Sequence, residues 1–450
     1  MLFELAAMLS TSASLGVVAE VPVVPARSEI VAVQPLSASA AALNPMPYLG
    51  PDPASLSGPG GLALEPTGPV TDTVLLESRG MSLLSRLAVL PEGRLQQTLA
   101  AHPELAAELL AAPPAPARVA AWWTDTPLAS RLALLDAAPE LVGNLEGVPY
   151  AMRDLANRQL LDDTLAELAD ETSRGEGRAA IDRATTSRAM LEQVRDALVA
   201  KPGEARRSLL ALDVSEEGRA VVASGHVSTA DHVTFLVPGM FFGVESRIVD
   251  WADTAQELVD EQRAWLDRLD RGDERVAAIA WIGYDTPTLL NVADMEAARS
   301  GRDAVTAAIR GLDASRVGDE PSVAIVAHSY GSAAAMLALQ ENGIHVDALA
   351  IVGSPGSPAA TAADLHVAAG QVYAGAAPWD PIPWSGAFGS QPLDAAYGAR
   401  VMSVAGGTDP ITGEELQGAV GHNDYFGAGS EAMRNFALIG IGEGELVTRG

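Results

Sequence analysis

The chain has 450 residues and a formal net charge of −29, with 48% hydrophobic and 19% charged residues. It can bury a large core, and its acidity excludes a nucleic-acid partner because a polyanion would be repelled. Cysteine is absent and Lys201 is the only lysine, so thiol nucleophiles, Cys-ligated zinc and a GxxxxGK[ST] phosphate-binding loop are excluded.

Residues 1–79 are expected to form an N-terminal arm followed by a connector rich in Pro, Ser and Ala. Residues 1–24 are mostly apolar, but Arg27 is the first basic residue and Glu4 stands where an export signal carries positive charge. Ser, Thr and Glu20 interrupt the run, so no transmembrane segment is expected. We prefer a plain arm on a cytoplasmic protein; a remnant signal of an exported or cell-envelope protein stays open as the alternative.

Residues 80–205 carry Leu and Ala at three- and four-residue spacing, which predicts an α-helical domain. Pro91 and the segment 99–105 are echoed 36 residues later by Pro127 and the segment 135–141. Two copies indicate a paired-helix layer, because a solenoid needs three or more units. Two roles stay open for this domain: it caps the active site, or it binds a partner.

From about residue 206 to residue 450, strands and helices alternate. The expected strands are 209–214, 219–224, 233–237, 276–282, 322–327, 348–352, 371–374 and 400–404. The expected helices are about 248–270, 292–311 and 332–340. Apolar strands alternating with helices predict an α/β fold: a mainly parallel sheet with helices on both faces. The first two strands are expected to form an antiparallel edge.

One of these strands runs directly into Ala327-His328-Ser329-Tyr330-Gly331 and then into a helix of small residues. This strand–turn–helix context is typical of a nucleophile elbow, where a sharp turn exposes the serine hydroxyl at the end of the sheet. Ala327 stands where glycine is usual. Ser329 is therefore the candidate nucleophile.

A serine nucleophile needs a histidine base, which should follow it late in the chain. His345 precedes the next strand and would lie at the wrong end of the sheet, and His366 lies in a helix-like segment too early for the last loop. His422 lies in the loop Gly-His-Asn-Asp-Tyr-Phe after the final strand. We therefore expect His422 to be the base.

The acid that orients this histidine should follow the strand 371–374. Asp380 does so and is the preferred candidate. Asp409, after the last strand, is the alternative. Asp424 lies two residues from His422 and is expected to cap its own loop.

An oxyanion hole should complete the site with two backbone N–H groups. One is expected from Tyr330, after the nucleophile, and the other from Met240, in the loop after strand 233–237. Phe241 and Phe242 follow as an apolar wall beside the reacting centre or as ordinary core. Tyr284 is a further pocket candidate, with packing as the alternative.

Several segments together resemble a known family. They are VPG (237–239), WIGYDTP (281–287), AHSYGS (327–332), VGSPG (352–356), WDPI (379–382) and GHNDY (421–425). These segments resemble an alpha/beta-hydrolase family that is filed as a domain of unknown function and is common in high-GC Gram-positive bacteria. The upstream segments LEGVP (145–149) and RDLANR (153–158) resemble the helical region that precedes its catalytic part.

This resemblance implies an alpha/beta-hydrolase fold and a triad of Ser329, Asp380 and His422, without implying a substrate. Ala327 and Met240 depart from the usual pattern, and Met240 bears on the shape of the pocket.

We expect a serine hydrolase, esterase-like or lipase-like, that cleaves a small-molecule or lipid-like carboxylic ester through an acyl-enzyme. No cofactor and no metal are expected. An acyltransferase using the same triad, or a non-catalytic hydrolase-fold protein that acts as a binding or envelope module, stays open. A serine at the elbow disfavours an Asp-nucleophile dehalogenase or epoxide hydrolase. Nothing in the sequence sets an oligomeric state.

Overall fold

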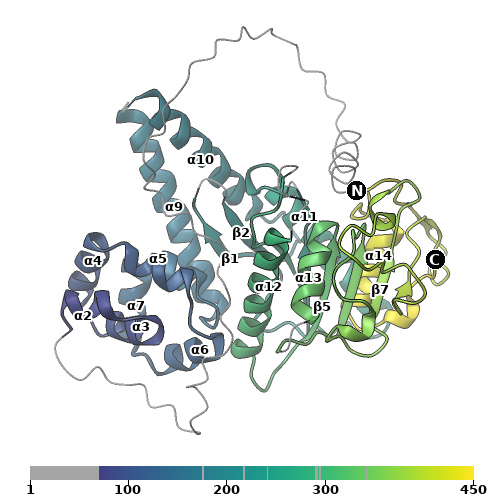
Figure 1. Ribbon diagram of the computed structural model, residues 1–450, viewed down its shortest axis with the longest axis horizontal. Helices are drawn as coiled ribbons and strands as arrows, with labels where there is room; N and C mark the ends of the chain where they lie inside the picture. The colour runs from purple at the N-terminus through teal and green to yellow at the C-terminus, as the bar shows by residue number, and fades with distance from the viewer. Residues whose placement is uncertain are drawn as a thin grey trace.

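The computed structural model describes residues 70–174, 177–215, 218–240, 242–288, 292, 295–340 and 343–450. Residues 1–24, where an export signal was considered, lie outside the described residues. A helical region and an α/β region lie next to each other (Figure 1). In the part of the chain that is described, no helix combines the length and apolar character needed to cross a membrane.

One sheet of eight strands organises the α/β region, in the order β1-β2-β4-β3-β5-β6-β7-β8. The strands are β1 Arg207–Asp213, β2 Arg219–Ser224, β3 His232–Val237, β4 Val276–Ile282, β5 Ser322–His328, β6 Ala348–Val352, β7 Val372–Gly375 and β8 Arg400–Val401. Strand β2 runs antiparallel to both β1 and β4, and the pairs from β4 to β8 are parallel. The predicted mainly parallel sheet with an antiparallel edge is confirmed.

Strand β8 is shorter than the expected 400–404. Beyond Val401 the chain turns to the C-terminal tail: Met402 bridges to Arg449, and the Ser403 N–H donates to the Thr448 carbonyl. The tail therefore takes over the pairing that the sequence pattern assigned to a longer strand.

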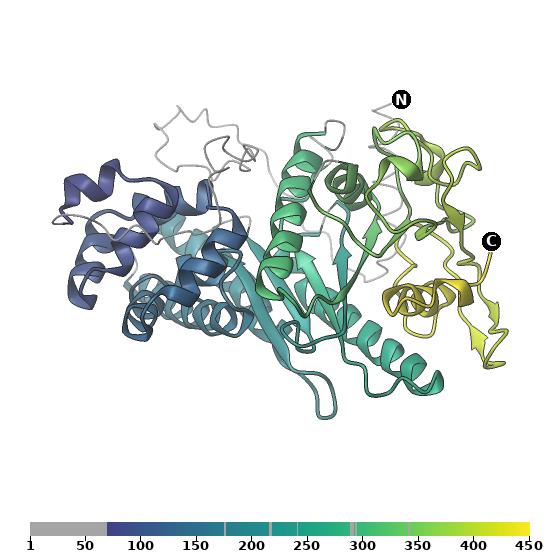
Figure 2. The same cartoon turned by 90° about the horizontal axis from the view of Figure 1, so that it is seen from below.

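Helices cover both faces of the sheet (Figure 2). Helices α11 (Val244–Arg268) and α14 (Glu431–Gly440) pack on one face, and α12 (Glu296–Ser315) and α13 (Tyr330–Gln340) cover the other. Side chains of a strand point alternately to the two faces. Along β5, Val326 accordingly joins one core and Ile325 the other.

The helical region begins with α2 (Asp72–Glu77), before the expected boundary at residue 80. The 36-residue echo corresponds to two units of three helices rather than to a paired-helix layer. The first unit is α3 Gly80–Ala88, α4 Glu92–Ala101 and α5 Glu104–Ala111, and the second is α6 Pro116–Asp125, α7 Leu128–Ala137 and α8 Pro139–Asn144. Pro91 and Pro127 occupy equivalent positions before α4 and α7. Both units contribute leucines to one shared core.

Polar side chains of α8 and α9 (Tyr150–Arg174) form hydrogen bonds with the backbone groups at the outer edge of β1. The Asn144 side chain pairs with both the N–H and the C=O of Leu212, at 3.0 and 2.9 Å. Asp154 accepts from the Leu209 N–H at 2.7 Å, and Asn157 donates to the Leu209 C=O at 3.1 Å. An edge strand exposes unpaired backbone groups, and here side chains take the place of a ninth strand.

The segments 145–149 and 153–158, which carried part of the family resemblance, contribute to this joint. Arg158 donates to the Arg207 carbonyl at 2.8 Å, and Arg153 donates to Glu146 at 2.9 Å. The helical region ends with α10 (Arg178–Ala197). It packs mainly on β1, α11 and α12. Strands β2, β4 and β3 separate β1 from β5, the strand that precedes Ser329. We therefore expect the helical region to support the sheet edge rather than to cap the serine.

Replacing Asp154 tests this joint. Asp154 is buried and also accepts from Arg158 and Arg206, at 2.8 and 2.7 Å. Asp154→Ala leaves these donors without their acceptor, and we expect the free energy of unfolding to fall by about 3 kcal/mol in urea denaturation. The control is Asp182→Ala, an exposed carboxylate 4.0 Å from Arg178, which should change stability by less than about 0.5 kcal/mol. Equal losses in both variants would contradict the proposed joint.

Candidate active site

Ser329 lies at the turn between β5 and α13. Its φ of 52° is in the left-handed region, a conformation in which a side chain other than glycine is strained. The Ser329 N–H donates to the Val352 carbonyl of β6 at 2.9 Å. At Gly331 a Cβ would lie 2.1 Å from the Pro238 carbonyl oxygen, so only glycine fits there. Ala327 is fully buried within the apolar core, which accommodates its methyl group.

Three side chains from three loops form one hydrogen-bonded chain. The Ser329 Oγ lies 2.8 Å from His422 Nε2, and His422 Nδ1 lies 2.9 and 3.0 Å from the two oxygens of Asp380. A carboxylate only accepts, so Nδ1 carries the proton and Nε2 accepts from the serine hydroxyl. The exposed fractions of Ser329, His422 and Asp380 are 1%, 6% and 1%. The arrangement is therefore enclosed and almost shielded from water.

Further donors surround the Asp380 carboxylate. The Tyr425 hydroxyl donates to one oxygen at 2.5 Å, and the Ile382 N–H donates to the other at 3.0 Å. Burial raises the pKa of Asp380, but the hydrogen bonds from His422, Tyr425 and Ile382 outweigh it and bring the pKa below its usual value. Asp380 is therefore held in its ionised form.

The other two candidate acids have different partners. Asp409 forms a buried ion pair with Arg434, at 2.9 Å, and accepts from the backbone of its own turn. Asp424 accepts from the Gly421 N–H at 2.7 Å, which is the expected loop-capping contact. Of the three aspartates, the structure places Asp380 beside His422.

His345 and His366 lie away from Ser329. Both border a hollow that also contains Ser322, the first residue of β5, whereas Ser329 follows the opposite end of that strand. His366 does not lie within a helix, as the sequence pattern suggested. It follows the single 3₁₀ turn Ala362–Asp364 and forms backbone hydrogen bonds with Leu339 and Val346.

His328 is a buried neighbour of His422 to which the sequence analysis assigned no role. Its Nε2 lies 2.8 Å from the backbone carbonyl of His422, and the two ring centroids are 4.7 Å apart. Because a carbonyl only accepts, Nε2 carries the proton. Burial and the adjacent His422 lower the pKa of His328 to about 3, so this imidazole is neutral at physiological pH. In the sequence, only its position directly before Ser329 indicates that His328 could lie near the site.

The backbone groups expected to form an oxyanion hole lie on two segments that meet at the serine. Tyr330 is the first residue of α13, and the first N–H groups of a helix point out of its N-terminus. Met240 ends the turn after β3 and is buried. The preceding Gly239 lies against Ser329, since a Cβ there would be 2.6 Å from the Ser329 Cβ.

The three pocket candidates differ in their surroundings. Tyr284 is fully buried, and its hydroxyl donates to the Pro238 carbonyl at 2.9 Å. It therefore packs beneath the turn that leads to Met240 and holds that turn in place. Phe242 is half-buried and packs edge-to-face on Trp251, at 5.0 Å between centroids. Phe241 lies outside the described residues.

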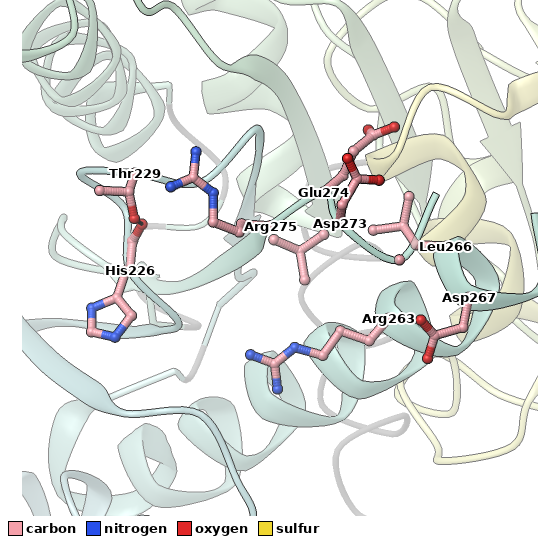
Figure 3. A pocket seen from close by; sticks show the side chains of 10 residues that line it. His226, Thr229, Arg263, Leu266, Asp267, Asp273, Glu274 and Arg275 are labelled. Atoms are coloured by element: carbon pink, nitrogen blue, oxygen red, sulfur yellow. Dashed lines mark hydrogen bonds between the residues drawn. The ribbon is translucent and has the colours of Figure 1, made fainter. Parts of the chain in front are cut away.

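A separate hollow of about 360 Å³ lies at the other end of the sheet, around the start of β4 (Figure 3). Figure 3 shows Asp267, Asp273 and Glu274 on one side of it. Its charged groups largely pair locally: Arg275 with Asp231 at 3.1 Å, and Glu274 with Arg271 at 2.6 Å. Among the described residues there is also no group of three or more side chains suited to hold a metal ion.

The low pKa of His328 makes a pH-dependent contribution to stability. Its pKa in the folded protein, about 3, lies below the value of 6.5 expected when unfolded. Protonation therefore favours the unfolded chain, and stability is lost as the pH falls from 6.5 toward 3. Urea midpoints should fall more between neutral pH and about pH 4 for the wild type than for His328→Gln. Parallel pH profiles would contradict the assignment.

The chain matches one family model and is similar in sequence to several mycobacterial proteins. A family model described as "Alpha/beta hydrolase" matches residues 213–389. Uncharacterized protein Rv2079 of Mycobacterium tuberculosis is 30% identical over 368 residues, covering 72% of this chain and 55% of the relative. Uncharacterized protein Mb0988c of Mycobacterium bovis is 32% identical over 240 residues, covering 50% of this chain and 86% of the relative.

Among solved structures, a thermostable esterase from Pseudomonas putida aligns over 64% of this chain and 98% of its own, at 13% identity and a TM-score of 0.30. The chain spans about half the length of the first curated relatives that it matches. From the family match and the relative covered over most of its length, the chain belongs to the alpha/beta hydrolase family.

Proposed function

We propose that the protein is a serine hydrolase that cleaves carboxylic esters through an acyl-enzyme, with Ser329, His422 and Asp380 as its catalytic triad. The supporting observation is the buried chain of hydrogen bonds from the Ser329 hydroxyl through the His422 imidazole to the Asp380 carboxylate, at 2.8 and 2.9 Å. The strained φ of Ser329 adds support, because backbone strain of this kind clusters at active sites.

In this mechanism His422 Nε2 takes the hydroxyl proton while the Ser329 Oγ attacks the carbonyl carbon of the ester. The N–H groups of Tyr330 and Met240 stabilise the oxyanion. The intermediate collapses to an acyl-serine, and His422 returns the proton to the departing alcohol. Water, activated by the same imidazole, then attacks the acyl-serine and releases the acid.

The buried groups around His422 suit this proton transfer. Ionised Asp380 stabilises the imidazolium that forms during attack. His328 remains neutral and so adds no second positive charge beside it. Its hydrogen bond to the His422 carbonyl also holds the backbone of a loop that no strand or helix fixes.

Replacing Ser329 tests the proposal. Ser329→Ala removes the nucleophile, and we expect kcat for p-nitrophenyl butyrate to fall by about 10⁴-fold or more without loss of the fold, as followed by circular dichroism. Ser246→Ala, which removes an exposed hydroxyl at the start of α11, is the matched control and should keep full activity. Adding a small alcohol separates the two reactions: an acyltransferase would form mainly the new ester instead of the acid. Full activity in Ser329→Ala would rule out this mechanism.

Tyr425 is proposed as a positioning residue for Asp380. Its hydroxyl donates to Asp380 and accepts from the Ala377 N–H at 2.9 Å. Tyr425→Phe frees the carboxylate to rotate, and we expect kcat to fall about 10- to 100-fold with KM nearly unchanged. Tyr397→Phe, which removes another buried hydroxyl that contacts Met336, should leave both constants unchanged. An unaltered kcat in Tyr425→Phe would show that Asp380 needs no such support.

A further inference from the structure

Two exposed tryptophans flank the proposed catalytic acid. The chain has seven tryptophans, and five of them are buried. The other two, Trp379 and Trp384, are 79% and 61% exposed and lie on either side of Asp380. A tryptophan in water leaves a large apolar surface unburied, and both are placed on one catalytic loop.

The neighbouring loop adds a third exposed apolar side chain. Val420 is 56% exposed and lies two residues before His422. The Trp379 N–H donates to the Val420 carbonyl at 3.0 Å, so these two residues are neighbours in space as well. The loops that hold the acid and the base thus present an apolar rim, consisting of Trp379, Trp384 and Val420.

The charges of the segments around the rim indicate which kind of surface it can bind. The segments 376–391 and 405–427, which contain the rim, have no lysine and no arginine. They contain several acidic residues: Asp380, Asp409, Glu414, Glu415 and Asp424. Anionic lipid surfaces are bound through clustered basic residues, whereas tryptophan favours boundaries between water and an apolar phase. An uncharged apolar phase therefore fits the rim.

We propose that the apolar rim docks the enzyme onto the surface of an aggregated, uncharged long-chain ester, which is then its substrate. The inference rests on the proposed ester hydrolysis. Ser329 is 1% exposed and is hydrogen-bonded to His422, which lies on the second of these loops. Contact at the rim therefore acts directly on the two loops that hold Asp380 and His422.

The test compares a dissolved with an aggregated substrate. Replacing both tryptophans by alanine should lower the rate on emulsified p-nitrophenyl palmitate by about tenfold or more. The rate on dissolved p-nitrophenyl butyrate should change by less than about twofold, because the triad is intact. Leu128→Ala and Val317→Ala remove exposed apolar side chains away from the rim and should change neither rate. Equal loss on both substrates, or no loss on the emulsion, would overturn the proposal.

A binding experiment separates this proposal from the proposed function. Ser329→Ala protein is mixed with a trioleoylglycerol emulsion and recovered by flotation, which needs no catalysis. We expect the protein to float with the emulsion, and to stop doing so when both tryptophans are replaced or when the droplets are coated with phosphatidylglycerol. Flotation with no esterase activity in the wild type would overturn only the proposed function. Flotation that ignores the tryptophans, or absence of flotation, would overturn the docking role.

Discussion

The site depends on one buried hydrogen bond, between the His422 imidazole and the Asp380 carboxylate, which joins loops 42 residues apart in the chain. An ionised carboxylate inside a protein is costly unless it is fully hydrogen-bonded. Here the imidazole, the Tyr425 hydroxyl and a backbone N–H share that task. Removing any of these donors leaves part of the Asp380 charge uncompensated. The same carboxylate also orients His422, so a change that disturbs its charge also disturbs the position of the imidazole.

The sheet provides the rigid support for that bond. Parallel strands bring the turns that follow β3, β5, β6 and β7 to one edge, and Ser329 and Asp380 both lie there. The other side of the molecule is fixed by a different device. Side chains of α8 and α9 pair with the backbone of β1, so the helical region is attached to the sheet by hydrogen bonds as well as by apolar packing.

The fold could be predicted largely from apolar runs, because strands such as β4 are buried on both faces and stand out as continuous segments. The end of β8 could not, since its boundary depends on the tail residues 448–450, which are remote in sequence. Chain order and loop position were enough to nominate Ser329, His422 and Asp380. The parts played by His328 and Tyr425 could not be predicted in this way, because each acts through a contact with a residue distant in the chain. Both Tyr284 and Trp379 lie in loops after strands. The sequence therefore could not show that Tyr284 is buried and Trp379 exposed.

The central claim is that this enclosed serine is activated. Incubation of the folded protein with a fluorophosphonate, followed by intact-mass analysis and peptide mapping, tests it most directly. We expect one covalent adduct per chain, located on Ser329. An adduct on another residue, or a folded protein that remains unlabelled after prolonged incubation, would contradict the account.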